Sequence, residues 1–375
     1  MLCTAAPDAL SAQPTADSLR FAGVGYLGDA ATVDSLFPLA TTLERLADEG
    51  GQSLSSRLLI ALRRAGVPVT VGLADRTGPA LALAFDEEYR SVEAVQGMGF
   101  KIITTLSAQL LTIDFRDGFA TVISALPSIV EYVDVQEARP GPSYTQRVAD
   151  AILPAFMSDD TTGQFALLAR AFAALPTPGS AICRVQLGEV SFDSVTTRLA
   201  SPRFGTDTTR LRAALAREAT RTWVTAARQP LLPSRSSQVQ GQMQARFANG
   251  DIYRLRVPEP DYVLAIDNLA ARRHVAAQNA ALRIDAVGLQ FEARVTVPGS
   301  PAPLVRGVYR QVTLDTIPQL RTDTDTWAGL VNSLAGLTAR LAVASRSNDR
   351  RWFDAVDVTR SSFPSLPAWI KKCAP

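Results

Sequence analysis

The chain has 375 residues, of which 47% are hydrophobic and 20% are charged, and its formal net charge is +2 at pH 7. This composition is typical of a globular protein long enough for two or three domains, and it excludes a disordered chain. The small net charge gives no bulk attraction to nucleic acid or to anionic lipid. Because no apolar run reaches the roughly 18 residues that span a bilayer, we predict no transmembrane segment.

Residues 1–18 are expected to be flexible or processed. Their start, MLCTAAPDALSAQP, is small and apolar but lacks the basic beginning of a complete signal peptide. The residues Leu10-Ser11-Ala12 are typical of a cleavage site, and Cys3 is a candidate for lipidation. Either interpretation predicts export across the inner membrane, to the periplasm or to the outer membrane. A frayed cytoplasmic amino terminus is the alternative.

The chain contains three cysteines, Cys3, Cys183 and Cys373. They allow three different single bridges, each with one thiol left over. A disulfide between Cys183 and Cys373 is one hypothesis, because an oxidising periplasm would favour it. Three unrelated free thiols are the other hypothesis. No CxxC motif or Cys/His cluster occurs, so the sequence indicates no zinc or haem site.

Residues 19–176 are predicted to form a first α/β domain. The expected elements, in chain order, are a strand at 19–26, a helical region at 35–64, strands at 81–95, 99–115 and 119–127, and helices at 144–156 and 164–174. Apolar residues at three- and four-residue steps indicate the helices, and partial alternation indicates the strands. The Asp117-Gly118 pair favours a hairpin between the last two strands.

Residues 181–345 are predicted to repeat this order as a second domain, followed by a tail at 346–375. The expected elements are a strand at 182–193, a helix at 208–227, a polar loop at 229–244, strands at 262–269, 281–297 and 304–314, and a helix at 327–342. We therefore predict an α+β fold of the two-layer α/β kind. It would have two tandem domains of strand, helix, three strands and helix, with mixed sheets and helices packed on one face. Generic α/β alternation is the alternative, because residue identity between the halves is low.

The second half contains the stretch PDYVLAI at 260–266, then a long strand, then a strand ending in VTL at 312–314. This pattern resembles a broad family of bacterial envelope α/β domains of the TolB amino-terminal, CsgG, PelC and FlgT type. The resemblance covers roughly 182–342 and, with fewer shared features, 19–156. The glycine that is usual in the family a few residues after this stretch is absent. The resemblance implies small α/β modules and carries no catalytic residues.

Residues Gly23 to Gly28 spell GxGxxG, the dinucleotide-binding pattern. Such a site needs a helix that begins at the glycines and a second strand that ends in an acidic residue about 20 residues later. Here Pro38 blocks a continuous helix, and residues 44–50 read ERLADEG, which is helical. We therefore expect a turn at the end of a strand and no bound cofactor.

Few other residues suit catalysis. The single histidine, His274, lies in an Arg-rich segment and is expected at the surface between strands, and no GxSxG motif supplies a nucleophile. The carboxylates at 86–88 and those of Asp114 and Asp117 are expected to be strand-edge and turn charges. We therefore assign no catalytic, cofactor-binding or metal-binding residue and predict that the protein is not an enzyme.

The densest charge feature lies on the predicted helix at 208–227, where Arg210, Arg217 and Arg221 fall on one side. A solvated helical face is the first interpretation. A surface that binds an anionic partner, such as lipid headgroups or an acidic protein, is the second. Nucleic acid is not favoured, because aromatic residues do not alternate with the arginines.

Taken together, the amino terminus, the repeated pattern, the resemblance and the scarcity of catalytic groups predict a non-enzymatic protein of the bacterial envelope, periplasmic or outer-membrane-associated. It would support assembly or secretion of a surface structure through contacts with envelope proteins or with a second copy of itself. The alternative is a small-ligand-binding protein or an enzyme that uses the Gly23–Gly28 turn and nearby carboxylates. A cytoplasmic interaction module is a third hypothesis.

Overall fold

The computed structural model describes residues 19–28, 30–72, 78–95, 99–116, 119–176, 183–234, 242–247, 252–300, 302–318 and 326–356, together with Trp369 and Cys373. The expectations for residues 1–18, including lipidation of Cys3, lie outside these residues. The Asp117-Gly118 turn lies outside them as well.

The strands are, in chain order, β1 (Leu19–Leu27), β2 (Val69–Val71), β3 (Gly78–Val95), β4 (Gly99–Arg116), β5 (Phe119–Gln136), β6 (Val185–Phe192), β7 (Gln242–Phe247), β8 (Ile252–Arg256), β9 (Tyr262–Gln278), β10 (Leu282–Thr296) and β11 (Val305–Pro318). The helices are the 3-10 turn η1 (Ala30–Thr32), α1 (Val33–Leu36), α2 (Pro38–Glu49), α3 (Leu54–Arg64), α4 (Tyr144–Met157), α5 (Gln164–Ala173), α6 (Ser194–Phe204), α7 (Thr208–Ala227), α8 (Thr326–Ser347) and α9 (Arg350–Val356).

The first sheet has the order β2-β1-β3-β4-β5-β8-β7, and β7 also pairs with β1. Strand β1 is parallel to β2 and β3, and β3, β4 and β5 form an antiparallel meander. Because β7 joins β8 to β1, one end of the sheet closes on itself. Alanines occupy much of the small core at this end, among them Ala80, Ala82, Ala84, Ala120 and Ala245. Their small side chains leave room for the sheet to curl this tightly.

The second sheet repeats this topology with the order β11-β10-β9-β6. Strand β6 runs parallel to β9, as β1 does to β3, and β9, β10 and β11 form the antiparallel meander. In both halves helices connect the parallel pair and further helices follow the meander. The predicted α+β fold with two mixed sheets and helices is therefore confirmed. The described helices lie on one face of the second sheet, whereas helices contact the first sheet from both faces.

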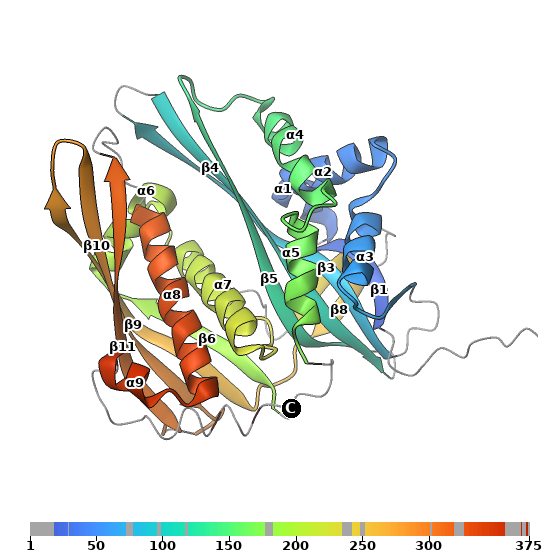
Figure 1. Cartoon of the computed structure of the whole chain (residues 1–375). Coiled ribbons are helices and arrows are strands. Elements are labelled where there is room, and N and C mark those ends of the chain that lie inside the picture. The colour runs from blue at the N-terminus through green and yellow to red at the C-terminus, as the bar shows by residue number, and fades with distance from the viewer. Residues whose placement is uncertain are drawn as a thin grey trace, which may run out of the picture.

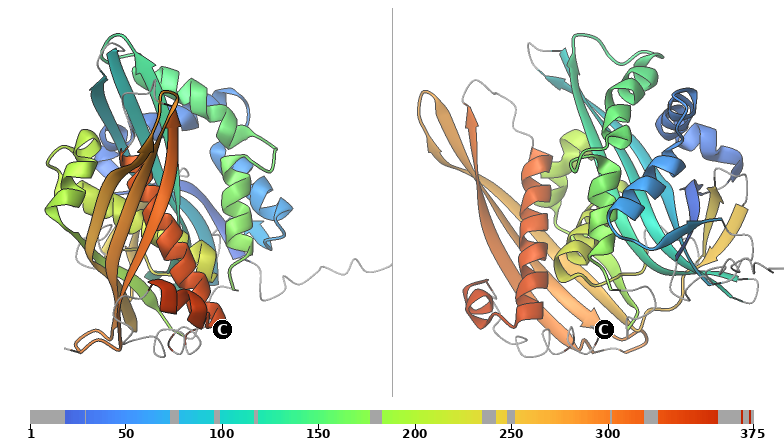
Figure 2. Two further views of the ribbon diagram at one scale, coloured as in Figure 1. Left: turned by 60° about the vertical axis from the view of Figure 1, so that its left-hand side comes forward. Right: turned by 45° about the vertical axis from the view of Figure 1, so that its right-hand side comes forward.

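The two sheets and their helices stack as layers (Figure 1). Helices α2 to α5 cover one face of the first sheet, and α6, α7 and α8 lie between the two sheets, contacting β3, β5, β6, β9, β10 and β11. No described helix covers the outer face of the second sheet (Figure 2). One continuous hydrophobic core joins the two helical layers and both sheets. None of the helices in the described ranges has both the length and the apolar character needed to cross a membrane.

A short segment after α7 links the two sheets through backbone hydrogen bonds. The N–H of Ala125 on β5 donates to the carbonyl of Leu231 at 2.8 Å, and the N–H of Leu232 donates to the carbonyl of Val185 on β6, also at 2.8 Å. Leu231 and Leu232 thus each form a backbone hydrogen bond to a strand of a different sheet, and these bonds fix the two sheets relative to one another at this point.

The structure differs from the sequence expectations in several places. Residues 242–247 and 252–256, which lie within the range expected for the second domain, form β7 and β8 of the first sheet. Strand β5 continues to Gln136, past the Pro127 at which the pattern seemed to end. Helix α6 and helix α9 were not expected, since α6 contains Pro202 and α9 lies within the expected tail.

Candidate functional site

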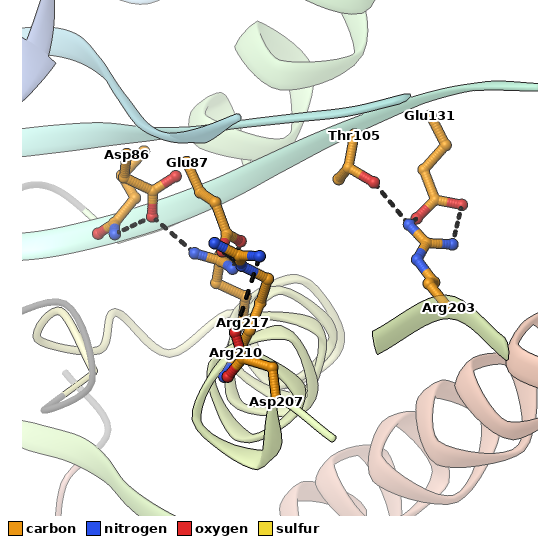
Figure 3. Close-up of polar contacts among 9 residues, drawn as sticks. Asp86, Glu87, Thr105, Glu131, Arg203, Asp207, Arg210 and Arg217 are labelled. Atoms are coloured by element: carbon orange, nitrogen blue, oxygen red, sulfur yellow. Dashed lines mark hydrogen bonds and ion pairs between the residues drawn. The ribbon is translucent and has the colours of Figure 1, made fainter. Parts of the chain in front are cut away.

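Arg203 of α6 and Arg210 and Arg217 of α7 face the first sheet, where they meet acidic side chains of β3 and β5 (Figure 3). Arg217 contacts Asp86 at 3.5 Å and forms a closer ion pair with Glu87. Arg210 pairs with the same Glu87 at 3.4 Å and with Asp207, the residue that caps α7, at 3.7 Å. We call these contacts, together with the Arg203–Glu131 pair described below, the ionic seam.

A bulge in β3 arranges the acidic side of the seam. The β3–β4 register shifts between Phe85 and Glu87, so Asp86 is an extra residue in the strand. Side chains of a strand alternate between faces, and one inserted residue reverses the alternation beyond it. Asp86 and Glu87 therefore both meet Arg217 of α7. On the opposite face, Phe85 contacts Tyr26 and Glu88 contacts α2.

The second part of the seam is built around Arg203, whose side chain is 3% exposed. Arg203 forms an ion pair with Glu131 of β5 and donates a hydrogen bond to Thr105 of β4. Its guanidinium lies 5.1 Å from the ring centre of Trp327 and 5.6 Å from that of Phe204. The aromatic rings and the carboxylate together replace the water that a buried guanidinium loses.

A cavity of about 270 Å³ lies beside the seam. Its charged walls are Glu87, Glu131, Glu218, Arg203, Arg217 and Arg221, and its aromatic walls are Tyr89, Phe204 and Trp327. The carboxylates and guanidiniums of the cavity pair with each other, as Arg221 does with Glu218. Balanced charge of this kind is suited to holding two layers together.

The three arginines singled out from the sequence thus have different environments. Arg217 has a side chain that is 9% exposed, so the solvated helical face expected for it is wrong. Arg210 is half-buried over the ring of Tyr89, 4.4 Å from the ring centre. Arg221 is the most exposed of the three and pairs with Glu218 on the same helix. Binding of an outside anionic partner by these arginines stays a prediction.

The Gly23–Gly28 segment lies largely inside β1. Gly23 has a φ of +97°, and the register between β1 and β3 shifts between Phe21 and Gly23. A Cβ atom at Gly23 would lie 3.2 Å from Oγ of Ser55 on α3, and that hydroxyl accepts a hydrogen bond from the N–H of Val24 at 3.0 Å. Gly23 therefore allows both a bulge and the close approach of a helix to the sheet.

A groove of about 460 Å³ lies beside this segment, and its charge does not suit a pyrophosphate. Its lining includes four carboxylates and a single guanidinium, those of Asp34, Glu44, Asp48, Glu49 and Arg45. Arg45 already pairs with Glu49 at 2.6 Å. The helix that follows Gly28, α1, has only four residues. The acidic groove would repel the phosphates that a dinucleotide site binds at a helix amino terminus.

Glu88 was not singled out from the sequence as a residue with its own role. Its carboxylate accepts hydrogen bonds from the N–H groups of Leu39, at 2.8 Å, and Ala40, at 3.3 Å, in the first turn of α2. Burial raises the pKa of Glu88 to about 7, and the two backbone hydrogen bonds oppose this rise only in part. The only sequence signal was a third consecutive acidic residue directly after an apolar run.

His274 lies within β9, opposite Ala286 of β10, and is exposed as expected. The sequence placed it in a link between strands, whereas the strand continues through it to Gln278. In the described part of the chain, no group of three or more histidine, cysteine, aspartate or glutamate residues could hold a metal ion.

A disulfide joins Cys183 to Cys373, with their Cα atoms 4.9 Å apart and a sequence separation of 190. Both cysteines are buried. Trp369, four residues before Cys373, packs edge-on against Tyr262 at the start of β9, with 5.7 Å between the ring centres. Both described residues of the carboxyl-terminal segment are therefore attached to the beginning of the second unit.

No protein-family model matches the chain, and no curated protein gives a significant match. Among solved structures, the chain is similar to a minor lipoprotein from Acinetobacter baumannii, with 15% sequence identity, covering 42% of this chain and 89% of that chain at a TM-score of 0.20. A likeness at this level carries no argument about function. The resemblance to envelope domains of the TolB, CsgG, PelC and FlgT type stays a prediction.

Proposed function

We propose that this chain is a non-enzymatic protein of the bacterial envelope, exported to the periplasm or the outer membrane, where it supports assembly or secretion of a surface structure through protein–protein contacts. The observation that carries the proposal is the buried disulfide between Cys183 and Cys373. Disulfides persist in oxidising compartments such as the periplasm and are rare in the reducing cytosol.

The ionic seam supports a scaffolding role. It holds the helices of the second unit against the first sheet, so the two α/β units present their surfaces in a fixed relationship. The outer face of the second sheet, which no described helix covers, carries the exposed apolar side chains of Val312 and Leu314 on β11, 66% and 64% exposed. Exposed apolar side chains gathered on one strand are typical of a contact surface.

The compartment is tested by expressing the chain from its natural gene, separating cytoplasmic, periplasmic and membrane fractions, and alkylating free thiols before and after reduction. We expect an exported protein in which two thiols react only after reduction. A protein recovered from the cytoplasm with Cys183 and Cys373 both free would contradict the proposal.

The contact surface is tested by placing a photo-crosslinking residue at Val312 or at Leu314 in living cells. Leu36, which is 52% exposed in α1 on the first unit, is the matched control position. We expect a discrete crosslinked partner from Val312 and Leu314 and none from Leu36. Equal crosslinking from all three positions would argue against a specific surface on β11.

Small-ligand binding beside the Gly23–Gly28 turn is the second candidate, because the groove of about 460 Å³ lies there. Its carboxylates favour a cationic ligand over a nucleotide. Thermal-shift screening separates the two functions, since a ligand at 100 times its Kd stabilises the folded state by about 2.7 kcal/mol. A shift with polyamines or amino sugars, absent in Glu44→Gln, would favour the ligand-binding function.

A further inference from the structure

A small cavity of about 140 Å³ lies on the far side of the first sheet from the ionic seam, between α3, α5 and the loop that joins α4 to α5. Arg57 and Arg64, seven residues apart on α3, share one face of that helix and line the cavity together with Arg170 of α5. The loop contributes Ser158, Asp159 and Thr161.

The charges around this cavity are not balanced. Three guanidinium groups line it against one carboxylate, that of Asp159. Asp159 contacts Arg57 at 2.8 Å and also pairs with Arg64, whereas Arg170 donates a hydrogen bond to the carbonyl of Thr161. The ionic seam pairs each of its arginines with carboxylates, and this cavity does not.

Arg57, which is largely buried, has Asp159, an exposed carboxylate, as its counter-ion. The side chain of Arg57 is 9% exposed, whereas that of Asp159 is 60% exposed. Hydrogen bonds from Arg57 and Arg64 hold the pKa of Asp159 below its usual value, so the carboxylate is charged at neutral pH. A buried cation is stable only with an anion in contact, and an exposed side chain is an anion that can be displaced.

The remaining walls are compatible with an anion that carries an apolar substituent. Ile60, Ala61 and Phe165 supply apolar surface. Phe165 lies in the first turn of α5, a helix of ten residues whose N-cap, Gly163, makes no side-chain capping bond. The positive end of the helix dipole therefore adds to the field of the three arginines.

We propose that this cavity binds a phosphoryl group, that of a phosphate ester or of an anionic lipid headgroup, and that Asp159 occupies the place of the phosphoryl oxygens when no ligand is bound. Guanidinium groups match phosphate geometry through paired N–H donors, and an arginine pair fixed on one helix face is suited to such bidentate contact. The site is independent of the proposed envelope function, because it uses neither the disulfide nor the second sheet.

The test uses the full chain and inorganic phosphate as the probe, titrated calorimetrically at constant ionic strength with chloride as the balancing anion. Arg64→Gln/Arg170→Gln removes two exposed guanidiniums of the cavity and leaves the buried Arg57 in place. Arg45→Gln is the matched control, since Arg45 is an exposed arginine on the neighbouring helix α2. Asp159→Asn removes the internal competitor.

We expect the wild type to bind phosphate saturably. The Kd for phosphate should rise about tenfold or more in the double variant and should not change in Arg45→Gln. Asp159→Asn should bind phosphate at least about fivefold more tightly and should gain more thermal stability from phosphate than the wild type does. A residue with a merely structural role would not tighten binding when it is replaced.

A second arm distinguishes the two sources of the phosphoryl group. Vesicles of phosphatidylglycerol and phosphatidylcholine are compared with vesicles of phosphatidylcholine alone in a co-sedimentation assay. If the wild type binds the anionic vesicles but not free phosphate, and the double variant loses this vesicle binding, the result supports the site and assigns it to a lipid headgroup. If neither the wild type nor Asp159→Asn binds either probe, or if the double variant binds as well as the wild type, the proposal is wrong.

Discussion

Arg217 on α7 and Asp86 on β3 lie 3.5 Å apart across the boundary between the two units, although 131 residues separate them in the sequence. Both side chains are almost inaccessible, with 9% and 2% of their surface exposed. The side-chain amide of Gln109 donates a hydrogen bond to the same oxygen of Asp86 at 2.7 Å. The contact therefore belongs to the interior of the protein.

Replacement of Arg217 by Ala should destabilise the protein strongly. It leaves the carboxylates of Asp86 and Glu87 buried without their main cation, and loss of one partner from a buried pair costs about 3 kcal/mol or more. Arg210→Ala is the matched control, because that arginine is half-exposed, and it should cost about 1 kcal/mol or less. Urea unfolding of both variants measures the difference, and equal stabilities would contradict a buried role for Arg217.

Glu88 should make the free energy of unfolding fall as the pH rises from about 4.5 to about 7. In this window the folded state keeps a proton on Glu88 that the unfolded state has released, so raising the pH favours unfolding. Above pH 7 both states are ionised and the contribution of Glu88 no longer changes. The effect should total no more than about 3 kcal/mol.

The variant Glu88→Gln isolates this effect, because an amide can still accept from the N–H of Leu39 but does not titrate. The difference in unfolding free energy between variant and wild type should change across pH 4.5 to 7 and should be constant above it. Glu49→Gln, a change of an exposed residue in α2, the helix whose first turn Glu88 contacts, should show no such pH dependence. A pH-independent difference for Glu88→Gln would show that Glu88 titrates alike in both states.

Reduction of the Cys183–Cys373 disulfide should lower stability by about 2–5 kcal/mol, because the bridge closes a loop of 190 residues and restricts the unfolded chain. Guanidinium unfolding with and without dithiothreitol measures the loss. The double variant Cys183→Ser/Cys373→Ser should match the reduced protein and should not respond to the reductant. A response of this variant would show that the reductant acts elsewhere.

Gly23→Ala should destabilise the protein by about 1–3 kcal/mol, since its φ of +97° disfavours a side chain and the new Cβ would approach Ser55 on α3. Gly141→Ala is the control, because no atom lies within 4 Å of a Cβ at that position and its φ is not in the left-handed region. Thermal unfolding of both variants compares them. An unaltered Tm for Gly23→Ala would contradict the idea that the positive φ and the close approach of α3 require glycine at this position.

Local signals in the sequence were sufficient to predict much of the fold. Helix α7 begins at Thr208 and ends at Ala227 as predicted, because Asp207 caps it and Leu211, Leu215 and Trp223 form one apolar stripe. The strand, helix and three-strand order of each half also followed from local periodicity, although α6, β7 and β8 did not. The pairing of β1 with β3, and of β6 with β9, is the repeated arrangement that such an order favours.

The candidate site could not be predicted in the same way, because it depends on non-local contacts. The bulge at Asp86 has no sequence marker, yet it decides which face of β3 receives Glu87 and which receives Glu88. The arginines of α7 were recognised as a group, but the partners of Arg210 and Arg217 on β3 lie more than a hundred residues earlier. The cavity at Arg57 was missed because Asp159 and Arg170 are far from α3 in the sequence.

The return of β7 and β8 to the first sheet has a consequence for the order in which the chain can fold during synthesis. The first sheet closes only after residue 256 has been made, and by then β6, α6 and α7 of the second unit already exist. A nascent chain that ends at residue 176 has both β1 and β5 without their last neighbours. The first unit can therefore be completed only after part of the second unit has been synthesised.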